Sequence, residues 1–265
     1  VFQPAVYDMD HVIRPIAISS EEEMTNQGDA AILSILENRV TSVASALKRD
    51  YVKHMVQGGG SPWDDWNTLN GIDETNGFLE NAAAGSGSQN ASVGGVSKST
   101  FSSKTGWNNQ FFDGSDSFNS NGLAGLYDLM VEIDAVSAQG KPNVILASRA
   151  GFKNLKRSLQ ASERYMDEKS LDGGKMSTVF QGVPIDVEDY MPNAGTNSAT
   201  NEASFYFLNM NDIYTCWDAK GYFDLSDFET VSGEYDVRAA KLRCRGQLMA
   251  KHLGSSGLAV NLDTF

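Results

Sequence analysis

The sequence predicts an α+β protein in which one very long helix, a small α/β unit and long terminal strands share a chain of 265 residues. Three observations lead to this fold class. The run DAAILSILENRVTSVASALKRDYVKHMV (29–56) contains no glycine or proline. From residue 123, helical patterns alternate with short apolar runs that are typical of buried strands. In the stretch 236–262, the run RAAKLRCRGQLMAKHL (238–253) is too long for an average strand, and a glycine-flanked turn and a second apolar run follow it.

Residues 1–20 alternate loosely between apolar and polar side chains, which indicates an extended segment. Pro4 and Pro15 suit an edge strand or a hairpin arm. The chain begins with Val1 rather than methionine, so we expect either that an N-terminal piece was removed by processing or that further residues precede it.

The run 29–56 is predicted to be a single helix, roughly 42 Å long at 1.5 Å per residue. Asp29 can cap its start, and the glycines at 58–60 end it. Its charged residues exclude a membrane span, and its spacing departs from a coiled coil. We therefore expect the central helix of a globular domain, with His54 solvated at its end. The apolar stripe that would face a sheet is Ile32, Leu36, Val40, Val43, Leu47, Tyr51 and Met55.

Residues 58–122 show little regular secondary structure but contain several aromatic side chains among asparagine, serine and glycine. Two interpretations have equal weight. The aromatic residues either pack on the subunit's own core or serve as anchors between subunits, because aromatic side chains dominate interface hot spots. Asn108, next to Trp107, could bond to the backbone of a neighbouring chain.

The second half of the chain has an α/β pattern. Helices are expected at 123–138 and 149–160, the second with a basic outer face, and strands at 143–148, 179–189 and 203–218. Within 236–262, the run RAAKLRCRGQLMAKHL (238–253) could be read as helix, but Gly246 and the GSSG turn at 254–257 favour a hairpin.

Composition restricts the possible functions. The formal net charge of −13 repels phosphate groups, which argues against sequence-specific nucleic-acid binding but not against a protein that encloses DNA. Cys216 and Cys244 are too few for a disulfide framework and wrongly spaced for zinc, so we expect buried thiols in a reducing cytoplasm.

No catalytic motif stands out. The three histidines are widely separated, and the acidic pairs at 64–65 and 188–189 are expected to be solvated turn residues. We therefore predict no enzyme activity, no cofactor and no metal, although an α/β hydrolase with unrecognised acidic residues is kept as an alternative.

The order of the segments resembles the major capsid protein of tailed bacteriophages, which has the Hong Kong 97 type capsid fold. The stretches that carry this resemblance are IAISSEEEMTNQGDAAILSILE (16–37), GGVSKSTF with GWNNQF (94–111), PNVILASRAGFKNLKRSLQASERYMD (142–167), VFQGVPIDVEDYMP (179–192), FYFLNM (205–210) and LRCRGQLMAKHLGSSGLAVNL (242–262).

The resemblance implies a division of the chain into family domains. Residues 1–20 would be an extended arm, part of the projecting hairpin called the E-loop. Residues 21–120 would form the spine helix and loops of the P-domain, residues 121–220 the A-domain, and residues 221–265 the terminal strands of the P-domain.

It also implies a function. Many copies would assemble into the icosahedral head shell of a tailed phage, as hexamers and pentamers that contact neighbouring capsomers. Portal, scaffold or decoration proteins would be further partners. The shell would form in the host bacterial cytoplasm, enclose double-stranded DNA without reading its sequence, and involve no membrane. A lysine–asparagine cross-link is not assigned. The predicted intersubunit contact residues are Trp63, Trp66, Trp107, Asn108, Phe111, Lys153, Arg157 and Arg164.

An encapsulin-like nanocompartment that stores a cargo enzyme is the main alternative within the same fold. The missing initiator methionine favours the phage head, because proteolytic maturation belongs to phage heads.

Overall fold

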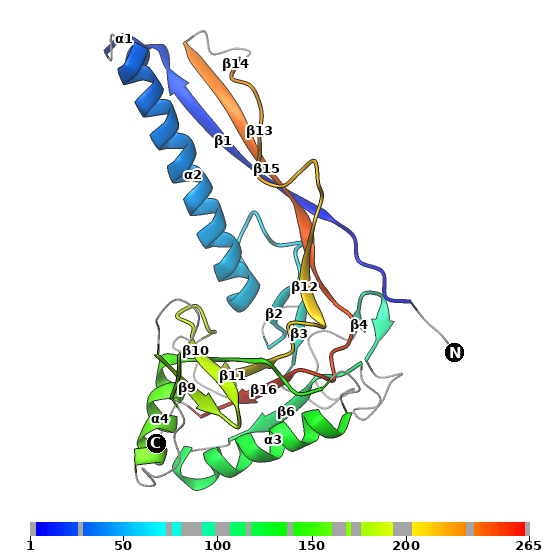
Figure 1. Cartoon of the computed structure of the whole chain (residues 1–265). Coiled ribbons are helices and arrows are strands. Elements are labelled where there is room, and N and C mark those ends of the chain that lie inside the picture. Colours follow the sequence, from blue (N-terminus) through cyan, green and yellow to red (C-terminus); the bar gives the residue numbers. More distant parts are fainter. Residues whose placement is uncertain are drawn as a thin grey trace.

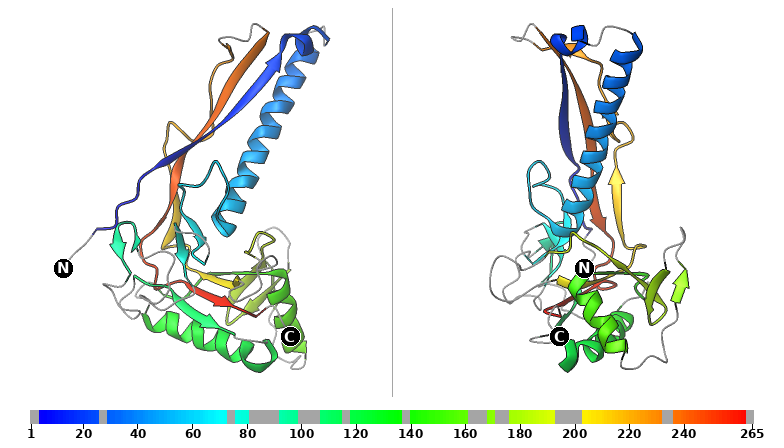
Figure 2. Two further views of the ribbon diagram at one scale, coloured as in Figure 1. Left: turned by 180° about the vertical axis from the view of Figure 1, so that it is seen from behind. Right: turned by 90° about the vertical axis from the view of Figure 1, so that its left-hand side faces the viewer.

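The molecule consists of a long rod and a broader base (Figure 1). In the rod, helix α2 (Asp29–Gln57) lies beside a ribbon formed by strands β1 (Asp10–Ser19) and β15 (Val237–Ala250). The base contains a mixed sheet with helices α3 (Leu123–Val136) and α4 (Arg149–Gln160), and both views in Figure 2 show the rod rising from it.

The computed structural model describes residues 4–25, 29–72, 76–80, 92–98, 107–114, 118–136, 140–160, 168–170, 176–192, 203–231 and 236–262. Its remaining elements are α1 (Ser20–Thr25), β2 (Thr68–Asn70), β3 (Gly77–Leu79), β4 (Ser92–Val93), β5 (Val96–Ser97), β6 (Gln110–Asp113), the π-helical turn η1 (Phe118–Gly122), β7 (Val144–Ala147), β8 (Glu168–Ser170), β9 (Met176–Phe180), β10 (Val183–Val187), β11 (Ala203–Leu208), β12 (Ile213–Trp217), β13 (Asp224–Leu225), β14 (Glu229–Thr230) and β16 (Gly257–Val260).

The predicted long helix is confirmed, and it packs on the β1–β15 ribbon. The two strands pair antiparallel from Asp10 opposite Gly246 to Ser19 opposite Val237. Val12 and Cys244 are buried in one cluster with Leu47 of α2, which is only 1% exposed. Because successive side chains of a strand point to opposite faces, the residues between these buried ones face away from the helix.

The C-terminal end of α2 is buried rather than solvated, so the expectation for His54 is wrong. Its side chain is only 3% exposed. Its Nε2 lies 3.1 Å from the carbonyl oxygen of Trp66, and its Nδ1 lies 3.4 Å from that of Gly59. The chain turns back at the glycines after the helix and covers this end, which the helical pattern alone does not show.

The base sheet has seven strands among the described residues, in the order β6-β16-β11-β7-β10-β9-β8. Phe205 and Phe207 of β11 pack in the cluster that contains the apolar faces of α3 and α4. Tyr206 and Leu208, which alternate with them, belong to a second cluster that also contains Val56 at the end of α2. The sheet is therefore covered by helices on one side and joined to the rod on the other.

The hairpin expected for residues 236–262 is wrong. β15 lies in the rod sheet, whereas β16 lies in the base sheet between β6 and β11. All four residues of β16 are buried, as an interior strand requires, while β15 alternates buried and exposed residues along much of its length. The segment 254–257 carries the chain from one sheet to the other.

The predicted domain ranges 21–120 and 221–265 each contain strands of more than one sheet, and the division into family domains stays a prediction. The segment 221–265 includes β15 of the rod sheet and β16 of the base sheet. The segment 21–120 likewise includes β6, which pairs with β16 in the same sheet. Residues 10–19 of the predicted arm form β1 and pair with β15 along their whole length.

Candidate functional site

Trp63 and Trp66, two of the predicted intersubunit anchors, lie in the subunit's own core. They are 2% and 0% exposed, and their rings contact each other edge to face at 5.0 Å. Tyr51 of α2 contacts both rings, and Trp217 contacts Trp66 at 5.5 Å. Side chains this deeply buried cannot contact a neighbouring subunit, so the anchor interpretation is wrong for these two residues and the core interpretation applies.

The other predicted contacts in this half of the chain lie in β6 or just before it. Trp107 and Phe111 are half-buried and pack against the cluster that joins rod and base. The indole nitrogen of Trp107 donates a hydrogen bond to the carbonyl oxygen of Val96 at 3.3 Å. Asn108 is buried at 2% exposure, so its side chain is not available to bond to a neighbouring chain as expected.

A buried ion pair between Lys98 and Glu80 is not apparent from the sequence. Nζ of Lys98 lies 2.8 Å from Oε1 of Glu80, and the two side chains are 2% and 1% exposed. Lys98 also donates to the carbonyl oxygen of Phe78 at 3.2 Å. Asn109 holds the backbone of Glu80 from both sides, accepting from its N–H and donating to its carbonyl oxygen, each at 3.0 Å.

Burial lowers the pKa of Lys98, because the charged form loses its water, and the negative charge of Glu80 partly opposes this shift. No motif or spacing in the sequence pairs these two residues. From the sequence, a lysine surrounded by serine, threonine and glycine is expected to be exposed to solvent.

The predicted basic face of α4 is present at the surface. Lys153 and Arg157 are exposed, as expected for contact residues, while Arg164 lies outside the described residues. At the start of α4, Arg149 forms a two-point ion pair with Asp189, with N–O distances of 2.5 and 2.8 Å. Hydrogen bonding to Arg149 lowers the pKa of Asp189, which keeps this carboxylate charged.

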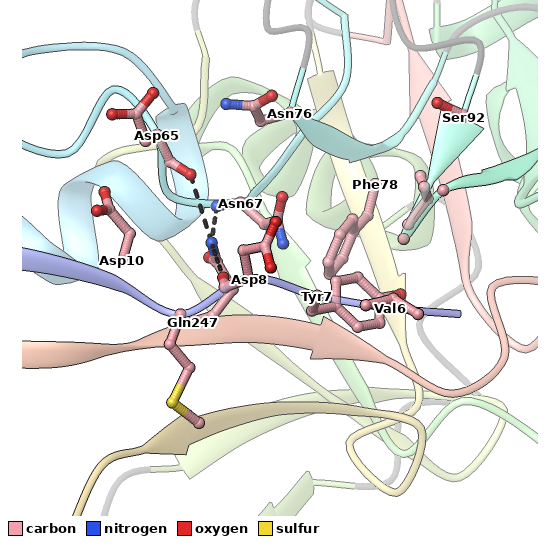
Figure 3. Close-up of a pocket in the computed structure, with 14 residues that line it drawn as sticks. Val6, Tyr7, Asp8, Asp10, Asp65, Asn67, Asn76, Phe78, Ser92 and Gln247 are labelled. Carbon is pink, nitrogen blue, oxygen red and sulfur yellow. Dashed lines mark hydrogen bonds between the residues drawn. The ribbon is translucent and has the colours of Figure 1, made fainter. Parts of the chain in front are cut away.

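A hollow of about 430 Å³ lies where the N-terminal segment passes the β4–β5 turn (Figure 3). The side chain of Gln247 in β15 forms hydrogen bonds to two chain segments that line the hollow, as the dashed lines in Figure 3 show. Its side-chain nitrogen donates to the carbonyl oxygens of Asp8 and Asp65 at 3.2 and 3.3 Å, and its oxygen accepts from the backbone N–H of Asn67 at 2.7 Å. The lining is mainly polar and acidic.

The titratable side chains that line this hollow are the carboxylates of Asp8, Asp10 and Asp65 and the phenol of Tyr7. No histidine, cysteine or lysine lines it. Burial raises the pKa of Tyr7 to about 12, so its phenol stays neutral, and it donates a hydrogen bond to the carbonyl oxygen of Ala250 at 2.9 Å. In the described ranges, no three histidine, cysteine, aspartate or glutamate side chains are grouped to hold a metal ion. No described helix is long and apolar enough to cross a membrane.

Comparison with known proteins identifies the fold. No protein-family model matches the sequence, and no curated protein is significantly similar to it. Solved structures do match. The holo-SrpI encapsulin complex of Synechococcus elongatus PCC 7942 is 12% identical, with 97% of this chain and 75% of that chain covered and a TM-score of 0.63.

Two capsids match over almost the same extent. The capsid of cyanophage A-1(L) is 16% identical, with 96% of this chain and 77% of that chain covered and a TM-score of 0.59. The capsid of an empty GTA particle is 14% identical, with 96% and 74% covered and a TM-score of 0.58. The chain therefore has the Hong Kong 97 type fold, as the segment order predicted.

Proposed function

We propose that this chain is a shell subunit, many copies of which assemble into a closed icosahedral particle. The observation that carries the proposal is the extent of the structural likeness, because proteins described as capsids and as an encapsulin match 96–97% of the chain, rod and base together. The architecture supports this function, since a rod that projects from a base offers surface that a single subunit does not bury.

Within this function we propose the head shell of a tailed double-stranded DNA phage, built from hexamers and pentamers. The net charge of −13 suits a container that must hold DNA without binding it tightly. Such a shell would assemble in the bacterial cytoplasm and become part of the virion. Neighbouring capsomers, and portal, scaffold or decoration proteins, would be its partners.

An encapsulin-like compartment is the second candidate. It is supported by the likeness to the Synechococcus elongatus encapsulin, whose TM-score of 0.63 exceeds the 0.58 and 0.59 of the two capsids. In that case the particle would enclose a protein rather than a genome.

Electron microscopy of the purified protein tests the shared proposal. We expect megadalton particles of uniform diameter that elute in the void volume of a size-exclusion column. A protein that remains a subunit across a range of concentration and salt would contradict a self-assembling shell. The contents of particles from the natural source separate the two candidates, because nuclease-protected DNA indicates a phage head and a co-purifying protein indicates a compartment.

A further inference from the structure

A second hollow, of about 440 Å³, lies on the face of the β1–β15 ribbon that points away from α2. Val12 and Cys244 point toward the helix, so their neighbours Ile13 and Arg243 face the hollow. We call this hollow the rod groove. It is lined by Met9, His11, Ile13, Asp218, Lys220, Gly221, Asp224, Lys241, Arg243 and Arg245.

The rod groove is basic on an otherwise acidic chain. Four lysine or arginine side chains line it against two aspartates, whereas the whole chain has a net charge of −13. Arg245 is paired with Asp218 at 3.2 Å. Among the described residues, no carboxylate lies within ion-pair distance of Lys241 or Arg243. The groove also presents Ile13, which is 42% exposed, so it combines an apolar contact with two cations that form no ion pair with any residue that the structure describes.

The far end of the rod carries the complementary features. Helix α1 forms a tip there (Figure 1), held by a reciprocal capping box in which Ser19 N–H donates to the Glu22 carboxylate and Glu22 N–H donates to Ser19 Oγ. Met24 is 69% exposed, the largest value among the exposed apolar side chains of the described residues, and Glu21 beside it is exposed as well. The tip therefore presents an apolar side chain and a carboxylate on a fixed turn.

A subunit cannot place its own tip in its own rod groove. Ile13 and Ser19 lie on the same strand, and a strand rises about 3.3–3.4 Å per residue, so the groove and the tip are roughly 20 Å apart. The pairing of β1 with β15 holds this separation. Any tip that fills the groove must come from another copy.

We propose that the rod groove of one subunit receives the α1 tip of a second copy of this chain. Glu21 then pairs with the cations of the groove, and Met24 packs on Ile13. This inference rests on the proposed shell function and specifies one of its contacts. Because tip and groove are different surfaces, the contact is head-to-tail, and repetition of such a contact generates rings.

The charges favour a second copy over nucleic acid as the occupant. Asp218 and Asp224 line the groove and would repel a phosphate backbone, and the net charge of −13 on the whole chain opposes its approach. A short projection with one carboxylate and one thioether side chain fits a groove of mixed charge with an apolar contact.

A charge-swap experiment tests the pairing. The groove variant carries Lys241→Glu with Arg243→Glu, and the tip variant carries Glu21→Lys with Met24→Lys. In each variant alone, the groove and the tip carry charges of the same sign and repel each other. We therefore expect the protein concentration at which half of the subunits are assembled to rise by about tenfold or more in low salt. An equimolar mixture should associate, because each variant then meets a complementary partner, and about 1 M salt should weaken that association.

The control variant carries Arg49→Glu with Lys53→Glu, which changes the net charge as much as the groove variant does but on exposed positions of α2. It should assemble like the wild type. Light scattering and analytical ultracentrifugation follow association, and circular dichroism checks folding. If the double groove variant does not fold, Arg243→Glu alone takes its place.

Two results would overturn the inference. A groove variant that assembles like the wild type would show that the groove is not a contact. A mixture that stays dissociated would show that the tip is not the occupant, and loss of binding to a short DNA duplex in the groove variant would then identify nucleic acid instead. Wild-type protein that associates without closing particles would count against the shell function alone, since the mixing experiment measures the contact independently.

Discussion

Replacing Lys98 by methionine should destabilise the subunit strongly. The substitution leaves Glu80, whose side chain is 1% exposed, as a buried carboxylate without its cation, and it removes the hydrogen bond to the carbonyl oxygen of Phe78. Breaking a buried ion pair by removing one partner costs about 3–5 kcal/mol, and a lost hydrogen bond about 1 kcal/mol. Together these two losses predict a decrease of about 4–6 kcal/mol in the free energy of unfolding.

The partner substitution should cost less, and the double substitution less than the sum. Glu80→Gln keeps an oxygen that can accept from Lys98, and Lys98, whose pKa burial already lowers, can lose its proton. We expect about 1–3 kcal/mol for this change. Lys98→Met with Glu80→Gln leaves no buried charge, so a coupling energy of at least about 2 kcal/mol should appear in the double-mutant cycle.

Urea denaturation of dissociated subunits, followed by circular dichroism, measures these differences. Arg149→Met is the control, because the ion pair that it breaks has side chains 76% and 55% exposed and is screened by water. Its denaturation midpoint should stay close to that of the wild type. A Lys98→Met subunit within about 1 kcal/mol of the wild type, or a double variant whose cost equals the sum of the two single costs, would refute the reasoning.

Four further predictions address other parts of the molecule. Leu47→Asp places an unpaired charge where the side chain is 1% exposed, so circular dichroism should show an unfolded subunit; a folded variant would contradict the packing of α2. Trp107→Ala should leave a folded subunit that fails to close particles in the electron microscope, and normal particles would show that this loop is no anchor. Lys153→Glu with Arg157→Glu should weaken assembly mainly at low salt, and shells indifferent to ionic strength would argue against a charged contact there. Burial raises the pKa of the Cys244 thiol from 9.0 to about 11, so its stabilising contribution is complete below pH 9 and is lost as the pH rises through 11. Melting temperatures of Cys244→Ala should therefore fall less steeply than those of the wild type over this range, and equal slopes would contradict the assignment.

The spacing of apolar residues was enough to predict those helices and strands whose type is determined within their own segment. The stripe that includes Leu47 predicted α2, and the apolar runs after residue 123 predicted α3, β7 and α4, all of which are confirmed. In the helices the apolar residues recur every three or four positions, and in β7 they form a short continuous run, so the spacing predicts the type of each element.

The sequence could not reveal which distant segments pair. GLAVNL reads as the second strand of a hairpin because it follows a turn, yet β16 pairs with β11 and β6 instead. The burial of His54 and the pairing of Lys98 with Glu80 likewise depend on chain segments that return from elsewhere. For the aromatic residues at 63 and 66, composition alone does not distinguish a core from an interface, since both bury aromatic side chains.

The pairing of β1 with β15 determines when during synthesis the rod can form. Asp10 lies opposite Gly246, so the ribbon joins positions at nearly opposite ends of the chain. Contacts between segments so distant in sequence form late, because the intervening chain must be ordered or closed into a loop first. A nascent chain therefore carries an unsupported α2 until Val237–Gly246 have left the ribosome. Chains truncated by stalled translation would lack the strand that pairs with β1, and with it the ribbon that positions the α1 tip.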